Sequence, residues 1–158
     1  MTRMLGRHVP TDRDVFLGEL DSFGALVSNP AGRGRYFTCL CVGDASDVAV
    51  DVLGTFCQNL LREGCVYFCA WGPGCERLHD IMDEEVIGGN PPESSFPSGI
   101  MTTSHEGEPL LNTVAFFLND ARPDPAFRSE TCSALIISVG SPGMVSELIG
   151  YAMPQLVT

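Results

Sequence analysis

The chain has 158 residues, the size of one globular domain. Its formal net charge is −11, from 20 acidic residues against nine basic ones, and every basic residue is an arginine. This balance argues against a protein that binds the phosphate backbone of nucleic acids, because such proteins are basic. The absence of lysine also excludes a P-loop and Schiff-base catalysis, since both need a lysine amine.

Residues 1–34 are the least regular part of the sequence. They contain Arg3, Arg7 and Arg13 but no apolar run of signal-peptide length. We expect an irregular N-terminal extension here, with at most a short helix that presents Val15, Phe16, Leu20 and Phe23 on one face. No stretch of the chain approaches about 18 consecutive apolar residues, so no membrane span is predicted.

From residue 35 onward, short apolar strands alternate with amphipathic helices. The pattern predicts strands at 36–42, 65–70, 100–103 and 134–139. It predicts helices from 44 or 46 to about 62, at about 75–87, from near Pro109 to Ala121, and from Pro142 onward, with a loop at 88–99. This order indicates one α/β domain over residues 35–158. The expected fold is a three-layer Rossmann-like or flavodoxin-like sandwich, with a mostly parallel four-stranded sheet and helices on both faces.

The seven cysteines are an odd number, and most lie inside apolar runs. Free cysteine packs as a small hydrophobic residue. We therefore expect reduced, mostly buried thiols in a cytoplasmic protein, and no structural zinc site.

The strand ends are the predicted site, because open parallel sheets bind ligands beyond the carboxyl ends of their strands. Trp71 offers a face for stacking, and Gly72 allows close backbone approach. Cys75 begins a predicted helix, a position that lowers the pKa of a thiol. The candidate ligand-binding residues are Asp44, Trp71, Gly72, Cys75, Ser104 and Ser141.

Two residues near these ends suggest acid–base chemistry. Glu76 lies in the first turn of the helix after the second strand, and His105 follows the third strand. If they converge, they are the candidate catalytic residues of a hydrolase that acts on a nucleotide-like small molecule. The alternative is that Glu76 is a solvated helix residue and His105 a cap or surface residue.

The same helix carries a weaker metal hypothesis. Glu76, His79 and Asp83 share one helix face with Asp80, and His79 and Asp83 are one turn apart. A solvated face is the simpler interpretation, and no cofactor is predicted. However, the acidic run Asp83 to Glu85 lies where the helix dipole disfavours anions, so a cation or an arginine-rich partner could compensate it.

The segments Tyr67 to Glu85 (YFCAWGPGCERLHDIMDEE) and Ile100 to His105 (IMTTSH) resemble a family of short, uncharacterised bacterial α/β proteins. The distinctive part is the string W-G-x-x-C-E-x-x-H-D, and the resemblance covers about residues 35–153. It implies a bacterial single-domain protein and brings no established activity.

These observations favour a small acidic binding or interaction protein of the accessory or immunity type over an enzyme. Its acidic residues Asp80, Asp83, Glu84 and Glu85 would dock a basic protein partner. A small polar ligand in the strand-end cleft, a homodimer and the hydrolase remain open alternatives. Neither nucleic acid nor membrane is an expected partner.

Overall fold

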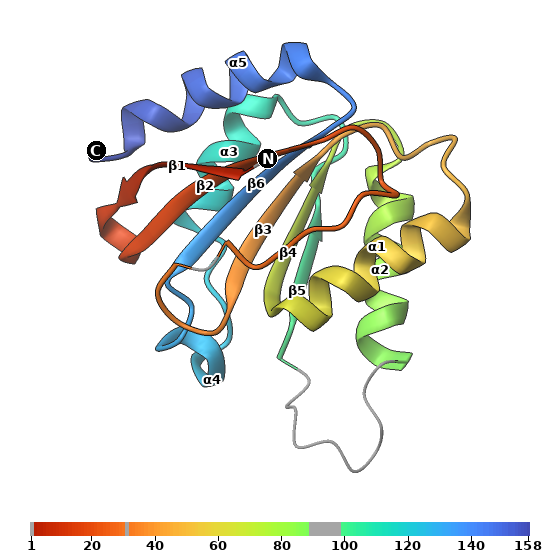
Figure 1. Cartoon of the computed structure of the whole chain (residues 1–158), viewed down its shortest axis with the longest axis horizontal. Coiled ribbons are helices and arrows are strands. Elements are labelled where there is room, and N and C mark those ends of the chain that lie inside the picture. The colour runs from red at the N-terminus through yellow and green to blue at the C-terminus, as the bar shows by residue number, and fades with distance from the viewer. Residues whose placement is uncertain (1, 31, 89–98) are drawn as a thin grey trace.

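In a computed structural model that describes residues 2–30, 32–88 and 99–158, the chain folds as a six-stranded sheet between two layers of helices (Figure 1). Along the sheet, the strands follow the order β1-β2-β6-β3-β4-β5. Strand β1 is antiparallel to β2, whereas all other neighbours are parallel. The strands are β1 (Thr2–His8), β2 (Arg13–Leu20), β3 (Phe37–Val42), β4 (Cys65–Trp71), β5 (Met101–Ser104) and β6 (Ser133–Val139).

Each face of the sheet is covered by one pair of long helices (Figure 1). Helices α1 (Val50–Glu63) and α2 (Cys75–Gly88) pack on one face, and α3 (Leu110–Asn119) and α5 (Pro142–Ala152) pack on the other. Successive side chains of a strand point to opposite faces, so Cys39 and Leu40 belong to different core clusters. A short helix, α4 (Pro125–Arg128), precedes β6, and 3-10 turns lie at Val9–Thr11 and Met153–Gln155.

The predicted alternation of strands and helices after residue 35 is confirmed, with small shifts at the boundaries. Helix α1 begins later than expected, and its N-cap, Ala49, makes no side-chain capping bond. The Asp44 carboxylate instead accepts bonds from the Ser46 backbone N–H at 2.9 Å and from its hydroxyl at 2.5 Å, which forms a turn before the helix. Most of the predicted loop, residues 89–98, lies outside the described residues.

The prediction of a four-stranded sheet is wrong, and so is that of an irregular extension or short helix, because residues 2–20 form two further strands. Strand β2 lies inside the sheet between β1 and β6, with Val15 and Leu17 fully buried. Strand β1 is a polar edge strand whose pairing shifts between Met4 and Gly6. Such a bulge interrupts the alternation by which a strand is found from sequence.

The burial of the cysteines agrees with the prediction of mostly buried free thiols. All seven are free, and only Cys132 is partly exposed while the other six are buried. Across the described ranges of the chain, we find no helix whose length and apolarity would let it cross a membrane.

The strand order also identifies one place in the sheet where a ligand would be expected to bind. After β3 the chain continues to α1 on one face, and after the neighbouring strand β6 it continues to α5 on the other face. Two adjacent parallel strands whose connections leave in opposite directions form a crevice at their carboxyl ends, the usual ligand position in open α/β sheets. We call the side of the sheet at which the parallel strands end the carboxyl edge, and the side at which they begin the amino edge. Both differ from the lateral edges of the sheet, which are strands β1 and β5.

Candidate ligand-binding site at the carboxyl edge

Three adjoining hollows lie at this crevice. The largest, of about 450 Å³, lies between the ends of β2, β6 and β3, and smaller ones of about 250 and 180 Å³ share lining residues with it on either side. Phe23, Gly24 and Val52 belong both to the central hollow and to the one along α1, whereas Gly140 and Ser141 belong to the central hollow and the one beside α5. Together the hollows form one surface depression, the strand-end groove.

The strand-end groove has an apolar floor. The Phe23 ring packs edge-on against Phe56, with ring centroids 5.1 Å apart, and thereby anchors the segment after β2 to helix α1. Beside it, Val52 and Leu26 are 38% and 76% exposed. Apolar side chains exposed side by side in a groove are a common feature of interaction sites.

Carboxylates surround this floor. Asp21 and Asp44 line the central hollow, and Asp51 lines the hollow along α1. The Ser46 hydroxyl and backbone N–H, which both bond to Asp44, hold the pKa of its carboxyl below the ordinary value. Asp44 therefore keeps its negative charge below the pH at which an ordinary aspartate loses it.

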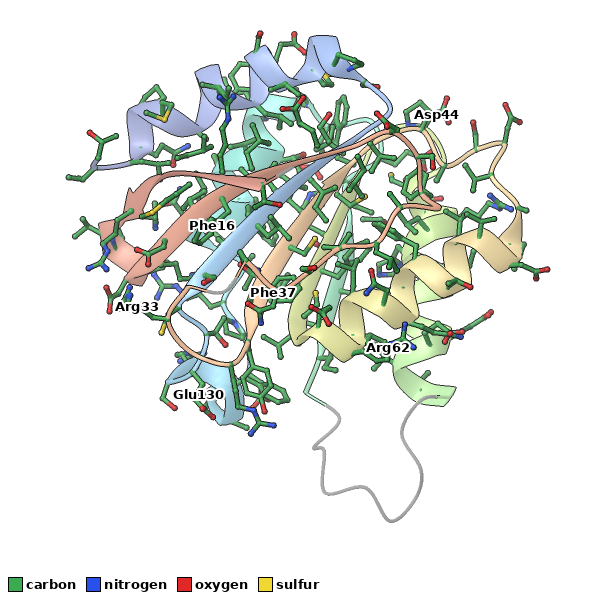
Figure 2. All side chains as sticks on the ribbon, in the orientation of Figure 1. Phe16, Arg33, Phe37, Asp44, Arg62 and Glu130 are labelled. Carbon is green, nitrogen blue, oxygen red and sulfur yellow. The ribbon has the colours of Figure 1, made fainter. Side chains whose placement is uncertain are left out.

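The wider carboxyl edge is also acidic. In the sequences that follow or close the parallel strands (19–24, 43–52, 71–77, 104–109 and 139–142), Arg77 is the single basic residue other than His105. Its guanidinium donates to the Ala45 carbonyl at 2.7 Å, so part of its hydrogen-bonding capacity is used inside the protein. Figure 2 shows Asp44 at this edge and Arg33 near the opposite one. The acidic residues in these segments are Glu19, Asp21, Asp44, Asp47, Asp51, Glu76, Glu106 and Glu108.

A separate hollow of about 310 Å³ lies farther along the edge, between Trp71, Gly72 and the loop from His105 to Glu108. The Trp71 indole N–H donates to the Glu108 carbonyl at 2.8 Å, which ties the end of β4 to this loop. Gly72 has φ +118°, and a side chain there would lie 2.2 Å from the Gly43 carbonyl oxygen. The hollow is therefore bounded by a tight turn that requires glycine.

His105 takes part in an internal network. It is 5% exposed, its Nδ1 lies 2.6 Å from a Glu108 carboxylate oxygen, and its Nε2 lies 2.8 Å from the Thr103 hydroxyl. Its ring also packs against Phe116, with centroids 4.9 Å apart. Both ring nitrogens thus have partners inside the protein, an arrangement that anchors the loop before α3.

The predicted activation of Cys75 is wrong. Its side chain is buried beneath the first turn of α2, and this burial raises the pKa of the Cys75 thiol, outweighing the backbone hydrogen bonds from His105 and Gly72 that lower it. Desolvation disfavours a thiolate more than the helix N-terminus favours it here. Cys75 is a core residue of the α1/α2 layer.

Glu76 is exposed and lies beside another carboxylate. A hydrogen bond and the negative charge of Glu106 raise the pKa of Glu76 above its ordinary value. The acid that faces Glu76 is thus a second glutamate, whereas the His105 ring is bonded to Glu108 and Thr103. Catalysis by Glu76 and His105 stays a prediction.

The metal hypothesis is modified by the structure. His79 lies with Asp80 and Asp83, and one potential ligand atom of each lies within 4.8 Å of the others. Within the ranges that the structure describes, Glu76 does not belong to this group. Thr102 on the neighbouring strand β5 contacts both His79 and Asp83.

The remaining predicted ligand residues do not lie together. Asp44 and Ser141 meet in the strand-end groove, whereas Trp71 and Gly72 line the separate hollow and Ser104 pairs with Ala70 at the end of β5. Sequence reasoning missed Asp21 and the segment after it. The detectable signal was an acidic residue directly after the apolar run of β2.

Comparisons with known proteins agree with the expectation of an uncharacterised family. A family model described as "Domain of unknown function (DUF7684)" matches residues 20–149, so it begins earlier than the predicted resemblance. Neither a curated protein nor a solved structure matches the chain.

Proposed function

Because the chain belongs to the DUF7684 family, whose description assigns no activity, we propose a function from the site itself: the protein binds a basic segment of another protein in the strand-end groove. The observation that supports this proposal is the pairing of an apolar floor at Phe23 and Val52 with a rim of carboxylates.

The charge of the groove selects the chemistry of the partner. Asp21, Asp44 and Asp51 attract guanidinium or ammonium groups and repel acidic surfaces. The sequence segments that form the groove bring no arginine to the rim. A partner with arginines or lysines therefore complements this surface.

The apolar floor indicates a peptide rather than a simple inorganic cation. Leu26 and Val52 expose apolar area that only an apolar side chain of the partner would cover. Alternating basic and apolar residues would fill both parts of the groove, since each carboxylate would meet a cation and the floor would meet hydrocarbon.

The test is fluorescence anisotropy with three labelled peptides: alternating arginine and leucine, alternating arginine and serine, and alternating glutamate and leucine. We expect the arginine–leucine peptide to bind most tightly and the glutamate–leucine peptide not to bind. Neutralising Asp21, Asp44 and Asp51 together with Asp→Asn substitutions should weaken binding by about tenfold, because each exposed ion pair contributes a fraction of a kcal/mol. Leu26→Ser should weaken the arginine–leucine peptide and leave the arginine–serine peptide unchanged.

The matched control removes three exposed carboxylates outside the groove, by Glu84→Gln, Glu130→Gln and Glu147→Gln. This variant has the same net charge as the groove variant and should bind nearly as the unmodified protein does. Equal losses in the two triple variants would show attraction by net charge alone and would refute the groove. Tighter binding of a free polyamine than of the arginine–leucine peptide would replace the protein partner with a small cationic ligand.

A further inference from the structure

A second cluster of polar side chains, separate from the groove, lies where helix α2 meets the edge strand β5. His79 is 22% exposed at its side chain, and its two ring nitrogens face different aspartates. Nδ1 lies 3.2 Å from an oxygen of Asp80, and Nε2 lies 3.6 Å from an oxygen of Asp83. The Thr102 hydroxyl of β5 contacts Nε2 at 3.0 Å and also the carboxylate of Asp83.

The contacts of Thr102 indicate that Nε2 of His79 carries hydrogen. An ionised carboxylate can only accept, so the Thr102 hydroxyl donates its single hydrogen to Asp83. Its oxygen is then left to accept from Nε2 of His79. In a neutral imidazole with hydrogen on Nε2, Nδ1 presents a lone pair.

That lone pair faces Asp80. In this tautomer two acceptors, Nδ1 and the Asp80 oxygen, lie 3.2 Å apart, so a metal ion between them would make the contact favourable, as a proton on Nδ1 would. Two donors that lie about 2.1 Å from a metal ion and 3.2 Å from each other subtend an angle of about 100° at the ion, close to tetrahedral. The geometry of His79 and Asp80 therefore fits an ion between them.

The groups that would hold a metal-bound His79 in position are also in place. Metal-bound histidines usually donate their other ring N–H to a carboxylate, carbonyl or similar group, which fixes the ring. Here Nε2 meets Thr102, which is itself bonded to Asp83. Asp80 is 76% exposed at its side chain and is free to adjust its position. Asp83 belongs to the same group but lies on the Nε2 side of the ring, so its carboxylate would turn toward the ion to become the third protein ligand.

The charge of α2 favours a cation independently of this geometry. Glu84 and Glu85 lie near the carboxyl end of the helix, its last turn has no basic residue, and its dipole disfavours anions there. Glu76 and Asp80, one turn apart, also repel each other. A divalent ion at His79 would offset part of this repulsion.

We propose that His79, Asp80 and Asp83 bind a divalent transition-metal ion of the Zn²⁺ class, with Thr102 orienting His79 and Asp83. One imidazole nitrogen and two carboxylate oxygens are ligands that Zn²⁺ accepts, and water would complete its coordination. Calcium and magnesium prefer oxygen ligands only, so they gain less from this site.

The test is isothermal titration of the full-length protein with ZnCl₂, together with its thermal melting with and without the metal. We expect one saturable Zn²⁺ site and a rise in Tm that disappears when a chelator is added. His79→Gln and Asp80→Asn should each weaken Zn²⁺ binding by more than about tenfold, and Thr102→Val by about tenfold. Asp80→Asn guards against loss of folding, because this residue is exposed.

The matched control is Glu84→Gln, which removes an exposed carboxylate from the same helix without touching the cluster. It should bind Zn²⁺ as the unmodified protein does. Equal losses in Glu84→Gln and Asp80→Asn, or unchanged binding in His79→Gln, would show only nonspecific attraction to acidic residues and would overturn the proposal. No saturable binding would overturn it too.

Cobalt provides a spectroscopic check. Co²⁺ bound at His79 should give visible absorption without a thiolate charge-transfer band, because no cysteine belongs to the cluster. A thiolate band would place the metal at a cysteine such as Cys132, the one partly exposed thiol, and would contradict the proposed site.

Discussion

The two edges of the sheet use charged residues in different ways. At the amino edge, Arg7 and Arg33 each contact both Asp12 and Asp14, at 3.1–3.5 Å. The buried Arg13 donates to the Thr38 hydroxyl and to a backbone carbonyl, and burial lowers the pKa of this guanidinium to about 10. These three arginines therefore have hydrogen-bonding partners within the protein.

At the carboxyl edge, acidic residues greatly outnumber cations. Asp44 bonds to a serine of its own turn, Glu76 meets another glutamate, and Arg77 donates to a carbonyl. The strand-end groove lies at this edge, in the crevice between the carboxyl ends of β6 and β3. The amino edge thus places its charges in internal ion pairs that stabilise the fold, whereas the carboxyl edge carries an excess of negative charge.

The largest expected effect concerns the turn that bounds the carboxyl edge. Gly72→Ala should destabilise the protein by more than about 3 kcal/mol, because the new methyl group would lie 2.2 Å from a backbone carbonyl at a positive φ. Gly107→Ala is the control, since Gly107 has φ +74° with open space around it and should cost only about 1 kcal/mol. Urea unfolding measures both, and equal costs would show that backbone conformation alone decides.

A smaller effect is expected when one aspartate of each edge is neutralised, because the two losses of stability should differ. Asp14→Asn should destabilise the protein by about 1–2 kcal/mol, because Asp14 is 11% exposed at its side chain and joins two arginines. The loss should shrink as salt rises from 0.05 to about 1 M, since ions screen the pairs. Asp44→Asn at the carboxyl edge should change Tm less. A larger loss at Asp44 would reverse the contrast between the edges.

The smallest effect is a pH dependence at Glu76. Because Glu106 raises the pKa of Glu76 in the folded protein, the folded state holds its proton at pH values above 4.5, where the unfolded chain releases it. Stability from this group therefore falls as pH rises through that window. Glu76→Gln should raise Tm at neutral pH and flatten this dependence relative to Glu147→Gln. An unchanged slope in Glu76→Gln would show that Glu106 does not raise the pKa of Glu76.

Much of the fold follows from local sequence patterns. The α1 and α2 stripes were predictable because each helix buries a periodic set of side chains. The apolar runs of β3, β4 and β6 were predictable because these strands are buried along nearly their whole length. Strand β1 was not, because it is an exposed edge strand with a shifted register at Gly6. Its polar sequence does not differ from that of a loop.

The sites were predictable only in part. The position of Asp44 and Ser141 at strand ends follows from topology, but the hollow that both share with the segment after β2 depends on β6 inserting between β2 and β3. Likewise, the helical spacing of His79 and Asp83 is visible in the sequence, whereas their contact with Thr102 depends on β5 packing beside α2. Tertiary neighbours from distant segments leave no local signal.

The most direct test of the central claim is a two-dimensional NMR titration of the ¹⁵N-labelled protein with the arginine–leucine peptide. We expect saturable shifts of backbone amides at 21–26, 44–52 and 140–141, the segments that line the strand-end groove. Amides of the amino edge, such as Arg33 and Asp14, should stay unchanged and serve as the internal control. Shifts that gather at 105–108, or that scatter evenly over all acidic surfaces, would contradict the groove as the binding site.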